Sequence, residues 1–213
     1  MKDIIELAIE YVKDFFKDDH SGHDYYHTMR VYNLAKNIAD FEKCDKEIVY
    51  LGALLHDVDD IKLVGEQKEK YINAKTFLQN NNYPEENIEK VIHIISQVSF
   101  KANGTMKPDN IEGMIVQDAD RLDALGAIGI SRAFEYGGNH NRPTYLPELK
   151  PLENMSKDEY YKNLGTTINH FYEKLLKLKD LMNTDTAKRI AEHRHEYVVQ
   201  FLDEFYNEWD GKC

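Results

Sequence analysis

The chain has 213 residues, of which 42% are hydrophobic and 31% are charged, a composition typical of one globular domain rich in amphipathic helices. Its 38 acidic residues outnumber its 27 basic ones, and the resulting net charge of −11 at pH 7 argues against non-specific binding of nucleic acid. Two cysteines without a disulfide or zinc pattern, and the lack of a signal-peptide or long apolar segment, predict a cytoplasmic protein with no membrane partner.

Apolar residues recur at helical spacing along most of the chain, which predicts an all-α fold. Residues 137–156 break this pattern with three of the five prolines and two adjacent glycines, so we expect a long irregular excursion there. We expect a single domain over residues 1–213, in which the helices of 157–208 complete a helical bundle. The expected helices lie at about residues 2–17, 24–41, 45–57, 68–81, 84–97, 109–123, 157–182 and 185–208.

The dipeptide His56-Asp57 stands at the end of the apolar stretch 48–55 (IVYLGALL), and two further acids, Asp59 and Asp60, follow it. A stretch this apolar should be buried, and burying His and Asp beside more carboxylates is costly unless their charge is compensated. A divalent cation compensates it, because imidazole and carboxylate groups are both metal ligands. The alternative from composition alone is a buried, hydrogen-bonded His-Asp pair without metal.

Two more residues complete a candidate metal site. His27 falls in the first turn of the helix expected at 24–41, on its core-facing side, and Asp120 lies in the helix expected at 109–123. Together with His56 and Asp57 they supply two nitrogens and two carboxylates to one divalent ion. Such a set suits Mn²⁺, Fe²⁺, Ni²⁺ or Zn²⁺ and, less comfortably, Mg²⁺.

The order His…His-Asp…Asp resembles that of the HD-domain metal-dependent phosphohydrolases, most of all the small stand-alone bacterial-type HD hydrolases. The core motifs lie within residues 22–138. The resemblance implies an HD-domain helical bundle with one metal ion, for which we favour Mn²⁺. Four segments carry it: GHDYYHTMRVYNLA, ALLHDVDD, VIHIISQVSFK and VQDADRLDALGAIGISRAFEYGG.

Two ligand positions have competitors nearby. Asp118 and Asp120 stand two residues apart, about 200° around a helix, so they cannot both point inward. The resemblance favours Asp120, because Arg and then Leu follow it. His23 competes with His27 and could instead contact the substrate.

The resemblance also implies roles in catalysis and substrate binding. Asp57 is a ligand at the reacting centre. An acid at the position of Asp60 helps to position or deprotonate the attacking water. The alternative for Asp60, with equal weight, is a solvated acidic residue at a helix end. His93 either lines the pocket or is a core histidine. Positive groups must neutralise phosphate, and Lys101 is the strongest candidate. The cations considered are Arg30, Lys62, Lys101 and Arg121, with Arg142 as a weaker one.

The resemblance implies hydrolysis of a phosphoanhydride or phosphoester bond in a small phosphorylated molecule, expected to be a nucleotide. We favour conversion of a nucleoside triphosphate to a monophosphate and pyrophosphate. The alternatives are a 5′-nucleotidase-type phosphomonoesterase, cleavage of cyclic nucleotides or dinucleotides, and a non-catalytic nucleotide-sensing module.

His193 and His195 are read as a solvated helix face, and the aromatic run around Trp209 as core or a homodimer contact.

Overall fold

A computed structural model describes residues 3–17, 24–60, 70–98, 107–152 and 165–213 of the chain. These residues group into two compact units, Met1–Asp120 and Arg121–Cys213. Helices are the only regular elements that the described residues form, which confirms the predicted all-α class. Among them no helix is both long and apolar enough to cross a membrane. The single-domain organisation stays a prediction.

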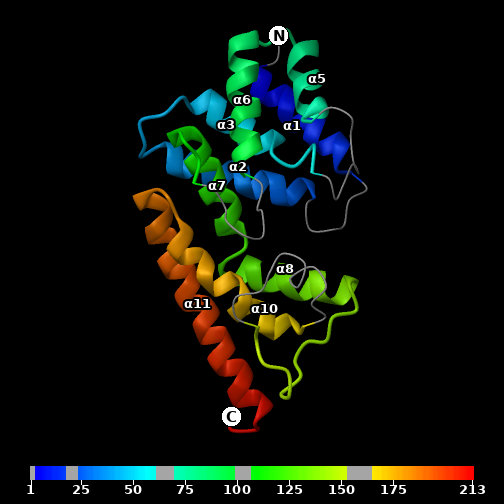
Figure 1. Cartoon of the computed structure of the whole chain (residues 1–213), viewed down its shortest axis with the longest axis vertical. Coiled ribbons are helices and arrows are strands. Elements are labelled where there is room, and N and C mark those ends of the chain that lie inside the picture. Colours follow the sequence, from blue (N-terminus) through cyan, green and yellow to red (C-terminus); the bar gives the residue numbers. More distant parts are fainter. Residues whose placement is uncertain (1–2, 18–23, 61–69, 99–106, 153–164) are drawn as a thin grey trace. The chain divides into compact units, whose positions relative to one another are not determined.

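The first unit is built around one apolar helix, α3 (Lys46–Leu55) (Figure 1). Almost every residue of α3 from Ile48 onward is buried, because its sequence has hardly any polar positions. At Gly52 a Cβ would come within 3.1 Å of the Ile94 side chain of one neighbouring helix, so the two helices pack closely. The helices packed on α3 are α1 (Ile4–Phe15), α2 (Tyr25–Ala39) and α6 (Glu85–Val98). The unit also contains α5 (Ile72–Asn80) and most of α7 (Ile111–Asp123).

Aspartate side chains fix where two of these helices begin. Asp24 accepts a hydrogen bond of 2.7 Å from the backbone N–H of His27, and so caps α2 as its sequence predicts. Asp45 caps α3 in the same way. The helix expected at 45–57 ends earlier than predicted, at Leu55; His56 is its C-cap, and Asp57 lies in the turn that follows.

The second unit holds α8 (Gly126–Asn139), α10 (Thr167–Glu173), a 3₁₀ helix η1 (Leu175–Leu181) and α11 (Asp185–Trp209). Both α8 and η1 pack against α11, and α10 contacts α8 and η1. Aromatic rings from three helices meet in its core, with the Phe171 ring centroid 6.0 Å from that of Phe134 and 5.9 Å from that of Phe201.

Two predictions for the second unit were wrong in detail. The excursion expected at 137–156 begins only at His140, because α8 continues through Asn139. Within this last turn of α8, Gly137 lies against Thr167, and a Cβ at position 137 would clash with the Thr167 Oγ1 atom. The single helix expected at 157–182 is, in its described part, α10 followed by η1. Leu175 and Leu178 are buried at a spacing of three, which agrees with the period of a 3₁₀ helix.

Candidate metal centre

Four predicted ligands from three separate helical segments come together in the first unit. The Asp57 Oδ2 atom lies 3.3 Å from Nε2 of His27 and 3.2 Å from Nε2 of His56. The Asp120 Oδ1 atom lies 3.6 Å and 4.0 Å from the same two nitrogens. Convergence of α2, the end of α3 and α7 therefore places two imidazoles and two carboxylates around one point.

Both histidines are buried and held in a fixed orientation. The His27 side chain is 0% exposed and projects from the first turn of α2, where the Asp24 cap fixes the backbone. The His56 Nδ1 atom lies 2.8 Å from the carbonyl oxygen of Ala53, to which it donates. In the neutral imidazole this hydrogen bond leaves the lone pair on Nε2, which is the arrangement expected of a metal-binding histidine.

The charges of the site act strongly on His56. Burial lowers the pKa of its imidazole, but the negative charges of Asp57 and Asp120 outweigh burial and raise that pKa to about 9. In the metal-free protein a proton on His56 therefore compensates part of the carboxylate charge at neutral pH. A divalent cation would take over this compensation.

The donor set fits a divalent ion. The ligand atoms of His27, His56 and Asp57 all lie within 4.8 Å of one another, and the three residues are buried. Ligand atoms about 2.1 Å from an ion lie roughly 3 Å apart, so the distances found require only small adjustments. Apart from its ion-pair contact with Asp57, the buried Nε2 atom of His56 has no hydrogen-bond partner in the described part of the chain, although imidazole nitrogens normally have one.

The two aspartates of QDADRLD differ in their surroundings. The Asp120 carboxylate approaches both histidines, and its side chain is 29% exposed, which leaves it accessible from solvent. Asp118, two residues earlier on α7, is fully buried. This is the arrangement expected if Asp120 is the ligand.

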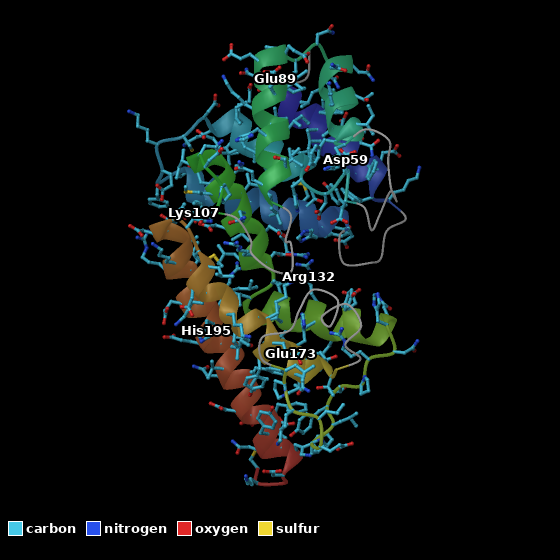
Figure 2. The ribbon with its side chains drawn as sticks, viewed as in Figure 1. Asp59, Glu89, Lys107, Arg132, Glu173 and His195 are labelled. Carbon is cyan, nitrogen blue, oxygen red and sulfur yellow. The ribbon has the colours of Figure 1, made fainter. Side chains whose placement is uncertain are left out.

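The two acids after the His-Asp pair also differ. The Asp59 side chain, labelled in Figure 2, accepts hydrogen bonds from the backbone N–H groups of Asn73 and Ala74 at the beginning of α5. Asp60 is half-buried, and its backbone N–H donates to the carbonyl of Asp57 within the turn. Sequence reasoning gave Asn73 no role, because nothing in INAKTF marks it.

The predicted substrate-binding residues are placed unevenly. Arg30 is half-buried on α2, one turn after His27. Arg121 is buried in the second unit and donates to the carbonyl of Leu181. His93 is no core histidine: it is exposed on α6, and its Nε2 lies 2.9 Å from an Asp109 oxygen. Three further candidates, His23, Lys62 and Lys101, lie outside the described residues.

Four residues that we did not assign to the metal site lie in the second unit. Arg142 stands 5.7 Å from the ring centroid of Tyr136. His193 is exposed and His195 half-buried on α11 (Figure 2 labels His195). Trp209 is 51% exposed and packs edge-on against Tyr145, with ring centroids 4.9 Å apart, so only part of this aromatic cluster is core.

The HD domain family matches residues 24–125 of the chain, a range that includes all four residues of the candidate centre. An HD-superfamily hydrolase from Bacillus thuringiensis is 42% identical, with 97% of this chain and 96% of that chain covered and a TM-score of 0.76. The chain belongs to the HD domain family. A crystal structure from Lactobacillus plantarum is 39% identical over 97% of both chains, with a TM-score of 0.84.

YpgQ of Bacillus subtilis is a third relative, 39% identical over 203 residues that cover 94% of this chain and 91% of YpgQ. The crystal structure of YpgQ in complex with ADP has a TM-score of 0.75 to this chain. These three proteins match this chain over nearly their whole length. The predicted membership among small stand-alone bacterial-type HD hydrolases is thus confirmed, and with it the class of metal-dependent phosphohydrolases. The roles of the individual residues stay predictions.

Proposed function

We propose that this HD protein hydrolyses nucleoside triphosphates to monophosphates and pyrophosphate. His27, His56, Asp57 and Asp120 would hold one divalent ion, with Mn²⁺ favoured. The observation that carries the proposal is the convergence of two buried imidazoles and two carboxylates, in which each carboxylate has an oxygen within 4.0 Å of both imidazole Nε2 atoms. A structural ion pair would need only two of these groups. The acidic side chains alone would repel a polyphosphate, so a cation is also required for binding.

The nucleotide part of the proposal draws on the relative that was crystallised with ADP. YpgQ is similar to this chain over nearly its full length, so the region that binds a nucleotide there has a counterpart here. ADP carries a base, a ribose and a polyphosphate, which is the class of ligand we predicted. A polyphosphate also suits several separate cations, each of which can form charge-assisted hydrogen bonds with a different phosphate.

When bound, the metal lowers the pKa of a coordinated water and polarises a phosphoryl oxygen. Asp60 stands three residues beyond Asp57, on the same turn, and would accept the proton of the attacking water. Attack at the α-phosphorus breaks its bond to the oxygen that bridges to the β-phosphorus, and pyrophosphate leaves with that oxygen. Arg30, half-buried one turn after His27, is the described cation best placed to help neutralise the phosphates.

The test is a panel of nucleoside mono-, di- and triphosphates incubated with the protein and Mn²⁺, with products separated by ion-exchange chromatography. Phosphate and pyrophosphate are measured separately, and Asp57→Ala is the inactive control. Monophosphate and pyrophosphate in equal amounts from triphosphates support the proposal. Phosphate released from monophosphates alone would identify a 5′-nucleotidase. No product from any nucleotide, with Mn²⁺ or with Mg²⁺, Fe²⁺, Ni²⁺ or Zn²⁺ in its place, would favour a nucleotide-sensing module.

A further inference from the structure

Asp59 caps α5 from outside that helix. Its Oδ1 accepts a hydrogen bond of 2.9 Å from the N–H of Asn73, and its Oδ2 accepts one of 3.0 Å from the N–H of Ala74. These are the second and third N–H groups of α5, the ones that an N-cap side chain usually binds. The N-cap residue itself, Tyr71, makes no such bond and has a φ of 60°, which is rare for an aromatic residue. The beginning of α5 therefore depends on Asp59.

A third hydrogen bond runs in the opposite direction. The side-chain amide of Asn73 donates to the carbonyl oxygen of Val58 over 2.8 Å. Val58 and Asp59 are thus bound to Asn73 and Ala74 by three hydrogen bonds, all of them partly buried. We call these four residues the 58–74 clasp. Partial burial makes such bonds costly to lose, because the freed donors and acceptors are poorly hydrated.

The clasp begins directly after Asp57, a residue of the candidate metal centre. On its N-terminal side Asp57 follows the C-cap of α3, and the local backbone bond from Val58 N–H to the Leu55 carbonyl is long, at 3.4 Å. The clasp fixes the backbone on the C-terminal side of Asp57. The direction of the Asp57 carboxylate is then determined from both sides, although this residue lies in a turn and not in a helix.

We propose that Asp59 and Asn73 are positioning residues of the metal centre, which hold the turn after α3 so that Asp57 faces His27 and His56. This inference rests on the proposed function insofar as it takes these three residues as metal ligands. It also assigns different roles to the two neighbouring acids. Asp59 is committed to the clasp, and Asp60 remains the acid for the reaction.

The chain offers a matched pair of variants on one helix. Asn73→Ala removes the 2.8 Å bond from a side-chain amide to the Val58 carbonyl at the beginning of α5. Asn81→Ala removes a 2.8 Å bond from a side-chain amide to the Phe77 carbonyl at the other end of α5. Both bonds are partly buried, so a loss of helix stability should be similar in the two variants. Only Asn73 is linked to the turn that carries Asp57.

The experiment titrates each full-length protein with Mn²⁺ alone and measures free Mn²⁺ by electron paramagnetic resonance. We expect Asn73→Ala to raise the Kd for Mn²⁺ about tenfold, the lower end of the loss known for residues that orient metal ligands. Asn81→Ala should bind Mn²⁺ as the wild type does, and saturating Mn²⁺ should restore most of the turnover of Asn73→Ala. Asp59→Asn keeps one acceptor oxygen and should weaken Mn²⁺ binding in the same direction.

The outcomes separate this inference from the proposed function. A wild-type protein that binds no divalent ion overturns the proposed function, and the inference with it. Wild-type affinity in Asn73→Ala, or an equal loss in Asn81→Ala, overturns the inference alone. Should Asn73→Ala fail to fold, circular dichroism will show it, and unchanged Mn²⁺ affinity in folded Asp59→Asn then overturns the inference.

Discussion

The imidazole of His56 is hydrogen-bonded through Nδ1 to the carbonyl oxygen of Ala53, three residues earlier, at 2.8 Å. Ala53 belongs to the last turn of α3, whose final carbonyl groups have no partner within the helix. The same bond therefore satisfies a helix end and directs Nε2 of His56 toward Asp57. A buried apolar helix that ends in His-Asp is thus a compact way to aim two ligands at one ion.

Replacement of either member of the pair should abolish metal binding. We expect about one metal ion per chain in the wild type and almost none in His56→Ala or Asp57→Ala, because each variant removes a buried ligand that no other group replaces. Elemental analysis of the purified proteins measures this. His193→Ala, at an exposed histidine of α11, is the matched control and should retain its metal. A His56→Ala protein with full metal content would refute the assignment.

The two aspartates of α7 should differ in the same assay. Asp120→Asn is expected to reduce metal occupancy more than Asp118→Asn, because the Asp120 carboxylate is the one found 3.6 Å and 4.0 Å from the two histidine nitrogens. Asp118 is fully buried, so its replacement should act mainly on the thermal unfolding midpoint. Occupancy is counted per folded chain to keep the two effects apart. Equal metal loss, or loss in Asp118→Asn alone, would reverse the assignment.

The sequence predicted those parts of the site that depend on helix periodicity. Asp24 is a recognisable N-cap, and His27 follows it with apolar residues one and two turns later, so its burial could be foreseen. The same logic accounts for His93, which the sequence left open. Val91, Ile94, Ile95 and Val98 are the buried face of α6, and His93 lies off that face.

The parts that sequence reasoning missed depend on contacts between distant residues or on a change of helix type. Asn73 carries no local pattern, because its importance comes from Val58 and Asp59, which only the folded chain brings near it. The change from α10 to a 3₁₀ helix at Lys174 was missed because leucines spaced by three also fit an α-helix. Asp59 and Asp60 look alike in HDVDD, and only their hydrogen-bond partners distinguish them.

Metal binding should strengthen with rising pH. The pKa of His56 is raised to about 9 in the metal-free protein, and the imidazole must lose its proton to bind an ion. Apparent affinity for Mn²⁺ should therefore increase about tenfold per pH unit between pH 7 and 8.5, with about one proton released. Isothermal titration calorimetry in buffers of different ionisation enthalpy counts that proton. Affinity that is independent of pH across this range would contradict the protonated state of His56.

The same shift has a consequence for the stability of the metal-free protein. The folded pKa of His56 lies above its unfolded value of about 6.5, so protonation favours the folded state. This contribution is fully present below pH 6.5 and is lost as the pH rises through about 9. The thermal unfolding midpoint in the presence of a chelator should fall over that window. His56→Gln should show a smaller fall, since it lacks the titrating group.

Asp60 and its neighbour Asp59 should affect different steps of the reaction. Asp60→Asn should keep the affinity for Mn²⁺ and lower kcat by about 10²- to 10⁴-fold, the range that general acid–base catalysis usually contributes. Asp59→Asn should weaken Mn²⁺ binding and recover most of its kcat at saturating metal, because its carboxylate binds the backbone of α5. Steady-state kinetics at several Mn²⁺ concentrations separate the two effects. If Asp60→Asn turns over nearly as fast as the wild type, Asp60 is only a solvated acid, and another group must accept the proton of the attacking water.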